Sequence, residues 1–280
     1  MKPMPRSWIA IPVLVAGSLC AGPQALAACT LGASSGGEPS LQTVFNDMFG
    51  AANGPSATND CIAEPGDALW KTVDSVGSAT ILVEIAGNAN GNMLGIYDSS
   101  NTSNSLQLFS GPASTGSRAY ITVSGSPGNY VVTVDSFTSA GNTSVTATFG
   151  SSVFGFYLNQ PAAAGGQRFY SDSSLNPGIN GGAVKDYMYA YQGNGATFLN
   201  SSIYAPAIVK NTQFRTNDNI LAWEDLSSGS DSDYQDMIVL LRDIVPAPPP
   251  VPLPATVWLL LSGIAIMLPL ARRRERLHAA

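Results

Sequence analysis

Apolar and polar residues alternate over most of the chain, which is the pattern of half-buried β-strands. In residues 80–85, for example, Ile81, Val83 and Ile85 would share one face of a strand. The same period of two recurs at 94–97, 119–124, 130–137, 144–149, 154–158, 167–171, 187–192, 220–224 and 237–241. Clusters of Gly, Asn, Ser and Pro separate most of these segments and predict turns. No long helix is predicted between them, so the pattern indicates an all-β fold, an antiparallel β-sandwich or jelly roll.

One segment near the start has a helical period instead. Ser40 is a suitable N-cap, and Gly50 follows the last apolar position. The apolar stripe consists of Leu41, Val44, Phe45, Met48 and Phe49. We expect a short helix whose stripe packs on the core; binding of a partner by the same stripe is the alternative.

The N-terminus has the pattern of an export signal. Lys2 and Arg6 precede an apolar stretch at 8–21, and the small residues 25–27 form a cleavage site. Residues 1–28 are therefore predicted to be a signal peptide that signal peptidase removes after Ala27 or Ala28.

Two of the three cysteines, Cys29 and Cys61, would remain after this cleavage, since Cys20 leaves with the signal peptide. An exported protein meets an oxidising compartment, and the even count favours a disulfide between them. Residues 26–29 also fit a lipobox, in which case Cys29 would be acylated instead.

The C-terminus combines three segments. Residues 246–254 are rich in proline and predict a stiff, extended linker. Residues 255–271 are apolar and uncharged, and predict a transmembrane helix. Residues 272–280 begin with Arg272, Arg273 and Arg274, which act as a membrane stop and should stay on the cytoplasmic side.

This tail resembles the PEP-CTERM sorting signal in its VPLPA form. The motif is Val251, Pro252, Leu253, Pro254 and Ala255, and Trp258, the pair Ser262-Gly263 and the arginine cluster also match. The middle of the motif reads Pro-Leu-Pro instead of Pro-Glu-Pro, a variant that the family contains. The resemblance implies that an exosortase processes the protein while the C-terminal helix holds it transiently in the inner membrane. An ordinary anchor that is never cut is the alternative.

Charge and composition exclude several functions. The body at 29–245 has 18 acidic and seven basic residues, a net charge of −11, which repels nucleic acid and anionic lipid and suits divalent cations. The single histidine, His278, lies in the basic tail. The body therefore has no Ser-His-Asp or Cys-His arrangement and no histidine metal site. Hydrolysis by a carboxylate pair remains chemically possible, but no spacing supports it.

An aspartate-rich segment joins the last two predicted long strands. Its acidic residues are Glu224, Asp225, Asp231, Asp233 and Asp236. Carboxylates this close repel one another unless something compensates, and Ca²⁺ with its six to eight oxygen ligands would do so. The spacing is not that of an EF-hand, because the central Gly and distal Glu are missing. A hairpin held by Asp and Ser hydrogen bonds without a metal is the alternative.

The same segment resembles the family called domain of unknown function 4114. The matching stretches are 223–225 and 231–236, with Trp223 in place of the usual Phe and Gln235 in place of the usual Asn. Further similar stretches are 81–87, 95–98, 154–158, 169–172, 175–176 and 191–193. The resemblance covers most of the body, but the family has no settled biochemical role. We expect the body to be one domain at 29–245; a split into two domains near 150–152 is the alternative, although that stretch is short and has no proline or charge run.

Taken together, these features predict a non-enzymatic protein of the cell envelope or extracellular matrix. It would be exported, sorted by an exosortase, and associated with exopolysaccharide or biofilm through the sorting system it resembles. A carbohydrate-binding module is the first alternative, and a carboxylate-dependent hydrolase the second. The aromatic residues that could stack on sugar rings are Trp70, Tyr187, Tyr189, Tyr191 and Trp223, although an alternating tyrosine face is more typical of a core.

Overall fold

The computed structural model describes residues 25–34, 37–51, 53–84, 91–111, 113–161, 165–200, 204 and 206–248. Most of the predicted signal peptide, the sorting motif, the apolar C-terminal segment and the arginine stop lie outside the described residues. In the part of the chain that is described, no helix is long and apolar enough to cross a bilayer.

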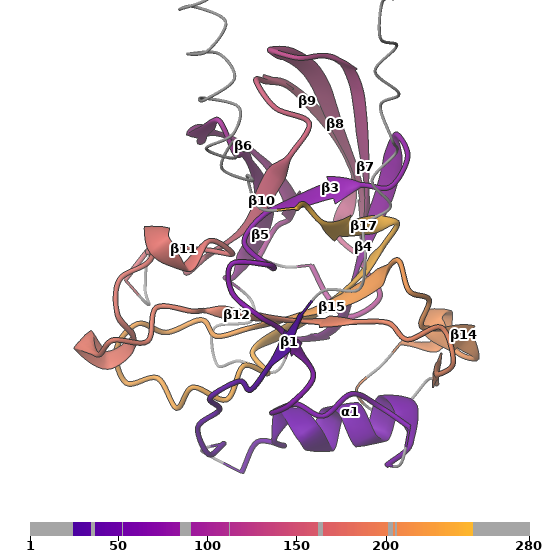
Figure 1. The fold of residues 1–280 in the computed structure, drawn as a ribbon. Helices are drawn as coiled ribbons and strands as arrows, with labels where there is room; N and C mark the ends of the chain where they lie inside the picture. The colour runs from indigo at the N-terminus through magenta and orange to yellow at the C-terminus, as the bar shows by residue number, and fades with distance from the viewer. Residues whose placement is uncertain are drawn as a thin grey trace, which may run out of the picture.

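Antiparallel strands form two large sheets (Figure 1). Sheet A has nine strands, in the spatial order β1 (Leu26–Ala27), β2 (Cys61–Ile62), β12 (Met188–Gln192), β15 (Asp218–Trp223), β16 (Met237–Arg242), β4 (Val76–Glu84), β7 (Arg118–Ser126), β8 (Asn129–Thr138) and β9 (Gly141–Phe149). Sheet B has the order β17 (Ile244–Pro246), β3 (Trp70–Thr72), β10 (Phe154–Asn159), β5 (Met93–Asp98) and β6 (Asn101–Phe109), with β11 (Arg168–Tyr170) also paired to β10.

The remaining elements are short. Strands β13 (Phe198–Leu199) and β14 (Thr212–Gln213) form a separate ladder, and 3₁₀ turns occur at Ser173–Leu175, Ile179–Gly181 and Ala207–Val209. Among the described residues, the one α-helix is α1, which covers Leu41–Phe49. The all-β prediction is confirmed, as are all ten strands expected from the period of two.

The helix α1 begins and ends where the sequence predicts. The Ser40 side chain accepts a hydrogen bond from the Thr43 N–H at 3.2 Å, so it caps the first turn. All five residues of the apolar stripe are buried. Phe45 meets Tyr191 of β12 edge to face, with ring centres 4.9 Å apart, so α1 covers one face of sheet A.

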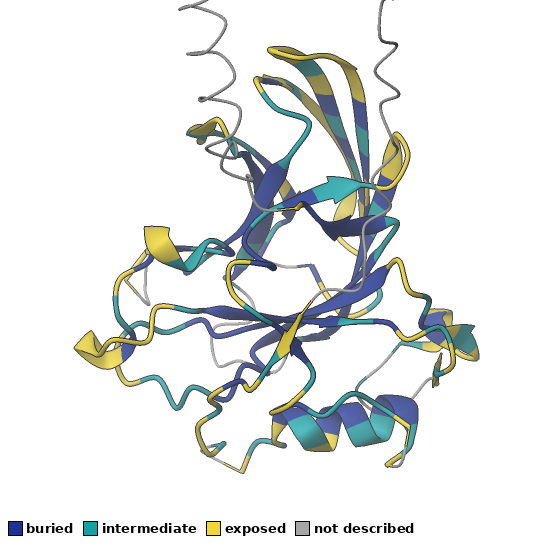
Figure 2. Ribbon diagram, in the orientation of Figure 1, coloured by how far each residue is buried: buried dark blue, intermediate teal, exposed yellow. Residues whose placement is uncertain are grey.

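Sheet B covers the opposite face of the same central strands. The side chain of Asn219 in β15, for example, donates to the Ile244 carbonyl in β17 at 2.9 Å. Because they are covered on both sides, β12, β15 and β16 are buried along almost their whole length (Figure 2). One core cluster contains buried residues from Cys29 to Ile244.

The strands at the other end of sheet A have a different environment. In β7 and β8 buried positions alternate with exposed or half-buried ones, and β9 is exposed at most positions. β7 and β8 therefore have one face towards the core and one towards solvent, as their sequence alternation predicts, whereas both faces of β9 are exposed over most of its length.

Strands β6 and β17 are absent from the predicted set. The first half of β6 is polar, at residues 101–105, and shows no apolar alternation. Strand β17 includes Pro246, so the folded body continues into the proline-rich segment. Pro246 lies at the edge of sheet B opposite Trp70, a position where a missing N–H breaks no ladder.

Cys29 and Cys61 form a disulfide, with their Cα atoms 6.2 Å apart. The bridge ties the segment before α1 to β2. Strand β1, which precedes it, pairs with β2 at the edge of sheet A, and the Ala25 carbonyl accepts the Ala63 N–H at 2.8 Å. Cleavage after Ala27 or Ala28 would remove this edge strand and leave the disulfide in place.

Candidate functional site

The acidic loop connects two central strands of sheet A. β15 and β16 pair antiparallel, and their last pair is Trp223 with Met237. Glu224 and Asp236 are the next residue on each strand, so the ladder itself brings these two carboxylates to the same place. The loop between them carries Asp231 and Asp233 back over this end of the hairpin.

Three carboxylates form a buried group, which we call the inner triad: Glu224, Asp233 and Asp236. One carboxylate oxygen from each lies within 4.8 Å of the other two. All three residues are buried, and Glu224 is only 1% exposed. Its Oε1 accepts the Leu226 N–H at 3.1 Å, whereas its Oε2 has no hydrogen bond of good geometry from any described residue.

Asp233 also belongs to a second, more exposed group with Asp231 and Glu38, in which the carboxylate oxygens again lie within 4.8 Å of one another. The Gln235 amide joins the two halves of this group. Its Nε2 donates to Asp233 Oδ2 at 2.7 Å and to Glu38 Oε2 at 3.0 Å. Glu38 is far away in sequence, so no local pattern could have indicated it.

Asp225 belongs to neither group and holds the loop in position instead. Its Oδ2 accepts from Asn92 Nδ2 at 2.8 Å, and its N–H donates to Asp236 Oδ2 at 2.8 Å. Its carbonyl accepts from the Gln160 amide. Asn92 and Gln160 come from two other loops and were also absent from the sequence-based set.

The backbone of the loop is held in an unusual conformation. Ser232 and Tyr234 both have a φ of 59°, in the left-handed region. The Gly32 N–H donates to the Ser232 carbonyl at 2.7 Å, and a Cβ on Gly32 would lie 1.6 Å from the Asp231 carbonyl oxygen. The Tyr234 ring stacks on Tyr189 with centres 4.2 Å apart. The N-terminal segment and β12 thus fix the loop from two sides.

Burial makes the ionised form of the inner triad unfavourable. It raises the pKa of Glu224 to about 8, and the Leu226 N–H and the Ser230 hydroxyl only partly offset this. Burial and then the neighbouring Asp225 raise the pKa of Asp236 well above its usual range, and burial also raises the pKa of Asp233. Within the described residues, no Lys or Arg forms an ion pair with the triad. A proton or a cation must therefore compensate these carboxylates.

The donor set fits a hard cation. The inner triad offers only oxygen ligands, and the second group adds two further carboxylates through the shared Asp233. Ca²⁺ takes six to eight oxygen ligands and tolerates irregular geometry, whereas Mg²⁺ requires a nearly regular octahedron. Backbone carbonyls of the loop and water could complete the shell.

A second set of buried carboxyl groups lies beyond Tyr234. Asp67 is fully buried, and neither of its carboxylate oxygens has a hydrogen bond of good geometry from a described residue. Burial and then Asp186 raise its pKa well above the usual range; burial and then Glu64 raise the pKa of Asp186 to about 8. The Tyr234 hydroxyl donates to the Asp186 carbonyl at 2.7 Å, so the two acidic regions are structurally connected.

The five aromatic residues considered for sugar stacking are all buried. They are Trp70, Tyr187, Tyr189, Tyr191 and Trp223. Tyr187 stacks on Phe169 with ring centres 3.9 Å apart, and the Tyr191 hydroxyl donates to the Ala57 carbonyl at 2.8 Å. They pack in the core, and no sugar ring can reach their faces in this fold.

The chain matches no protein-family model, and neither a curated protein nor a solved structure is similar to it at a significant level. The resemblances of the tail and of the acidic segment therefore stay predictions.

Proposed function

We propose that this chain is an exported, non-enzymatic protein of the cell envelope or matrix, with a β-sandwich body that Ca²⁺ stabilises at the acidic loop. One observation carries the calcium part of the proposal. Glu224 is 1% exposed, its Oε2 has no hydrogen bond of good geometry from a described residue, and two further carboxylates lie within 4.8 Å. A bound cation satisfies all three groups together.

The position of the site suggests a structural role for the ion. The ligands come from the hairpin of β15 and β16 at the centre of sheet A, and Glu38 comes from the N-terminal segment. A cation at this point would join the start of the body to its last strands. All three carboxylates of the inner triad are buried, so a substrate has little access to them, which favours binding over hydrolysis.

The proposed location follows from the two ends of the sequence. The N-terminal segment has the pattern of a signal peptide, and the motif at 251–255 with its apolar and arginine-rich flank resembles an exosortase signal. The disulfide between Cys29 and Cys61 is in keeping with an oxidising compartment. Signal peptidase and an exosortase are the proposed processing partners, and association with exopolysaccharide is the proposed role.

Thermal unfolding of the exported protein, after EDTA treatment and then with Ca²⁺ or Mg²⁺ added, tests the site. At a free Ca²⁺ concentration 100-fold above Kd we expect about 2.7 kcal/mol of added stability, with a smaller effect of Mg²⁺. If Ca²⁺ changes neither the midpoint nor the heat signal in a titration, the loop is a metal-free hairpin and the calcium proposal fails.

A further inference from the structure

β9 is the last strand of sheet A, and β6, the last strand of sheet B, contacts both β8 and β9. The core-facing residues of β8 include Val134 and Ser136, which are buried, and the Ser136 hydroxyl donates to the Leu108 carbonyl of β6 at 2.6 Å. Their partners on β9 are Val145 and Thr143, which face the same way. Val145 is 40% exposed, although β6 of sheet B contacts β9.

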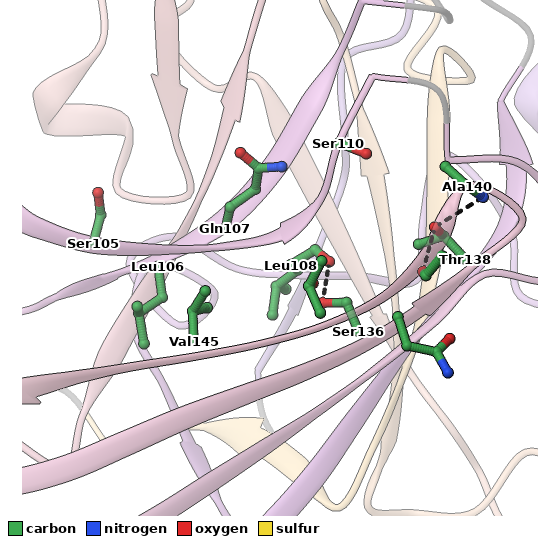
Figure 3. Close-up of a pocket in the computed structure, with 12 residues that line it drawn as sticks. Ser105, Leu106, Gln107, Leu108, Ser110, Ser136, Thr138, Ala140 and Val145 are labelled. Carbon is green, nitrogen blue, oxygen red and sulfur yellow. Dashed lines mark hydrogen bonds between the residues drawn. The ribbon is translucent and has the colours of Figure 1, made fainter.

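The partly exposed face forms one wall of a groove between β6 and β9, with a volume of about 470 Å³ (Figure 3). Leu106 and Val145 lie together at its apolar part. Hydroxyl and amide side chains, among them Thr143 and Asn142, line the rest. At one point Asn104 of β6 donates to the Thr148 carbonyl of β9 at 2.5 Å, which links the two strands there.

Both strands beside the groove are the last strands of their sheets. Each has nine residues and contains neither proline nor a charged residue. Soluble proteins usually protect such edges with lysine, proline, a bulge or a covering segment, because free N–H and C=O groups pair readily with another strand. Here residues 141–147 of β9 have none of the sequence-based protections.

The distribution of charge restricts what can approach this side. The body has a net charge of −11, yet residues 99–117 and 136–167 contain no charged residue, and both β6 and β9 lie within them. Two arginines lie close to this side. Arg168 donates to Ser105 at 3.4 Å and lies over the Tyr157 ring, and Arg118 lines a neighbouring pocket with Thr138 and Asn142. Ser105 itself lines the groove, so Arg168 reaches the groove through this contact but is not one of its lining residues, none of which is charged.

We propose that a second copy of this chain docks on this side, by strand addition along the edge of β9, beside β6, across a two-fold axis. Two bodies of net negative charge repel each other over most orientations, but here neither copy presents a carboxylate. The contact is isologous, so each copy covers Val145 and Leu106 of the other. The inference uses no residue of the acidic loop and is independent of calcium binding.

Sedimentation velocity of the exported protein over a range of concentrations tests the proposal, in EDTA so that calcium plays no part. Val145→Lys places a charge in the groove, and Val131→Lys is the matched control. Val131 lies on the neighbouring strand β8, points to the opposite face of sheet A and is 42% exposed, against 40% for Val145.

We expect wild type and V131K to dimerise as concentration rises, and V145K to need at least a tenfold higher concentration. Circular dichroism and the melting midpoint show whether each variant folds; if V145K does not, Thr143→Lys gives the same test at the next core-facing position. A wild type that stays monomeric at all concentrations, or equal weakening by V131K, overturns the proposal. So does a monomer that binds dextran, a neutral glycan probe, in a manner that V145K abolishes, since the groove would then be a sugar site.

Discussion

At the scale of single residues, the most informative feature is a carboxylate in the core without a basic partner. Glu224 is buried with Asp233 and Asp236, and Glu84 is another half-buried acid, with its Oε1 lacking a hydrogen bond from a described residue. Burial raises the pKa of Glu224 and of Glu84 to about 8 in each case. These two residues therefore have similarly raised pKa values, but only Glu224 belongs to the inner triad.

Comparing variants of Glu224 and Glu84 separates the effect of calcium binding on stability from the effect of burying a charge. Glu224→Gln and Glu84→Gln each remove a buried acid, so we expect both variants to be more stable than wild type at pH 8 in EDTA, by on the order of 1 kcal/mol. Only Glu224→Gln should lose most of the Ca²⁺-dependent shift in melting midpoint. An unchanged calcium response in Glu224→Gln would contradict the assignment of Glu224 as a ligand.

Asp186 determines part of the pH dependence of stability. Its pKa in the folded protein is raised to about 8, against a reference of 3.8, so the folded state binds its proton more tightly than the unfolded state does. Protonation of Asp186 therefore adds to the stability of the fold fully below about pH 4, and this added stability is lost as the pH rises towards 8. We expect Asp186→Asn to reduce the fall in melting midpoint between pH 4 and 8, measured in EDTA. A variant whose pH profile coincides with that of wild type would show that Asp186 is not involved.

At the scale of elements, the fold follows from which faces are covered. α1 and sheet B enclose the central strands of sheet A, and the N-terminal segment then packs against the acidic loop through the hydrogen bond from Gly32 to Ser232. The site is therefore made by contacts between elements, although most of its carboxylates are close together in sequence.

Gly32→Ala tests the contact between the N-terminal segment and the loop. The added Cβ would lie 1.6 Å from the Asp231 carbonyl oxygen, so one of the two segments must move. We expect about 1–3 kcal/mol of destabilisation and a weaker calcium response, measured by thermal unfolding with and without Ca²⁺. Ala33→Ser changes the neighbouring exposed residue and should behave as wild type. Equal behaviour of the two variants would show that this contact does not support the loop.

At the scale of the whole molecule, the disulfide is a feature that depends on where the protein works. The bridge between Cys29 and Cys61 closes a loop with a sequence separation of 32. In the oxidising compartment that the export signal predicts, the bridge can form and persist.

Removing the bridge should destabilise the body. Cys29→Ser combined with Cys61→Ser is expected to lose about 3–4 kcal/mol of unfolding free energy, from the closure entropy of a loop of this length. Cys20→Ser, which changes the cysteine of the predicted signal peptide, should leave the exported protein unchanged. Denaturant unfolding measures both, and equal stability of wild type and the double variant would mean that the bridge contributes nothing to the fold.

Local sequence patterns were enough to predict most of the secondary structure. The period of two predicted ten strands, and the spacing of the apolar residues with the Ser40 cap predicted α1, because both patterns depend only on neighbouring residues. The tertiary structure alone brought Glu38, Asn92 and Gln160 to the acidic loop and buried the five aromatic residues. It alone also left Val145 partly exposed beside β6, a strand whose polar first half shows no alternation. The reason is that these contacts join segments far apart in the chain, and whether a face is covered depends on the order of strands in two sheets.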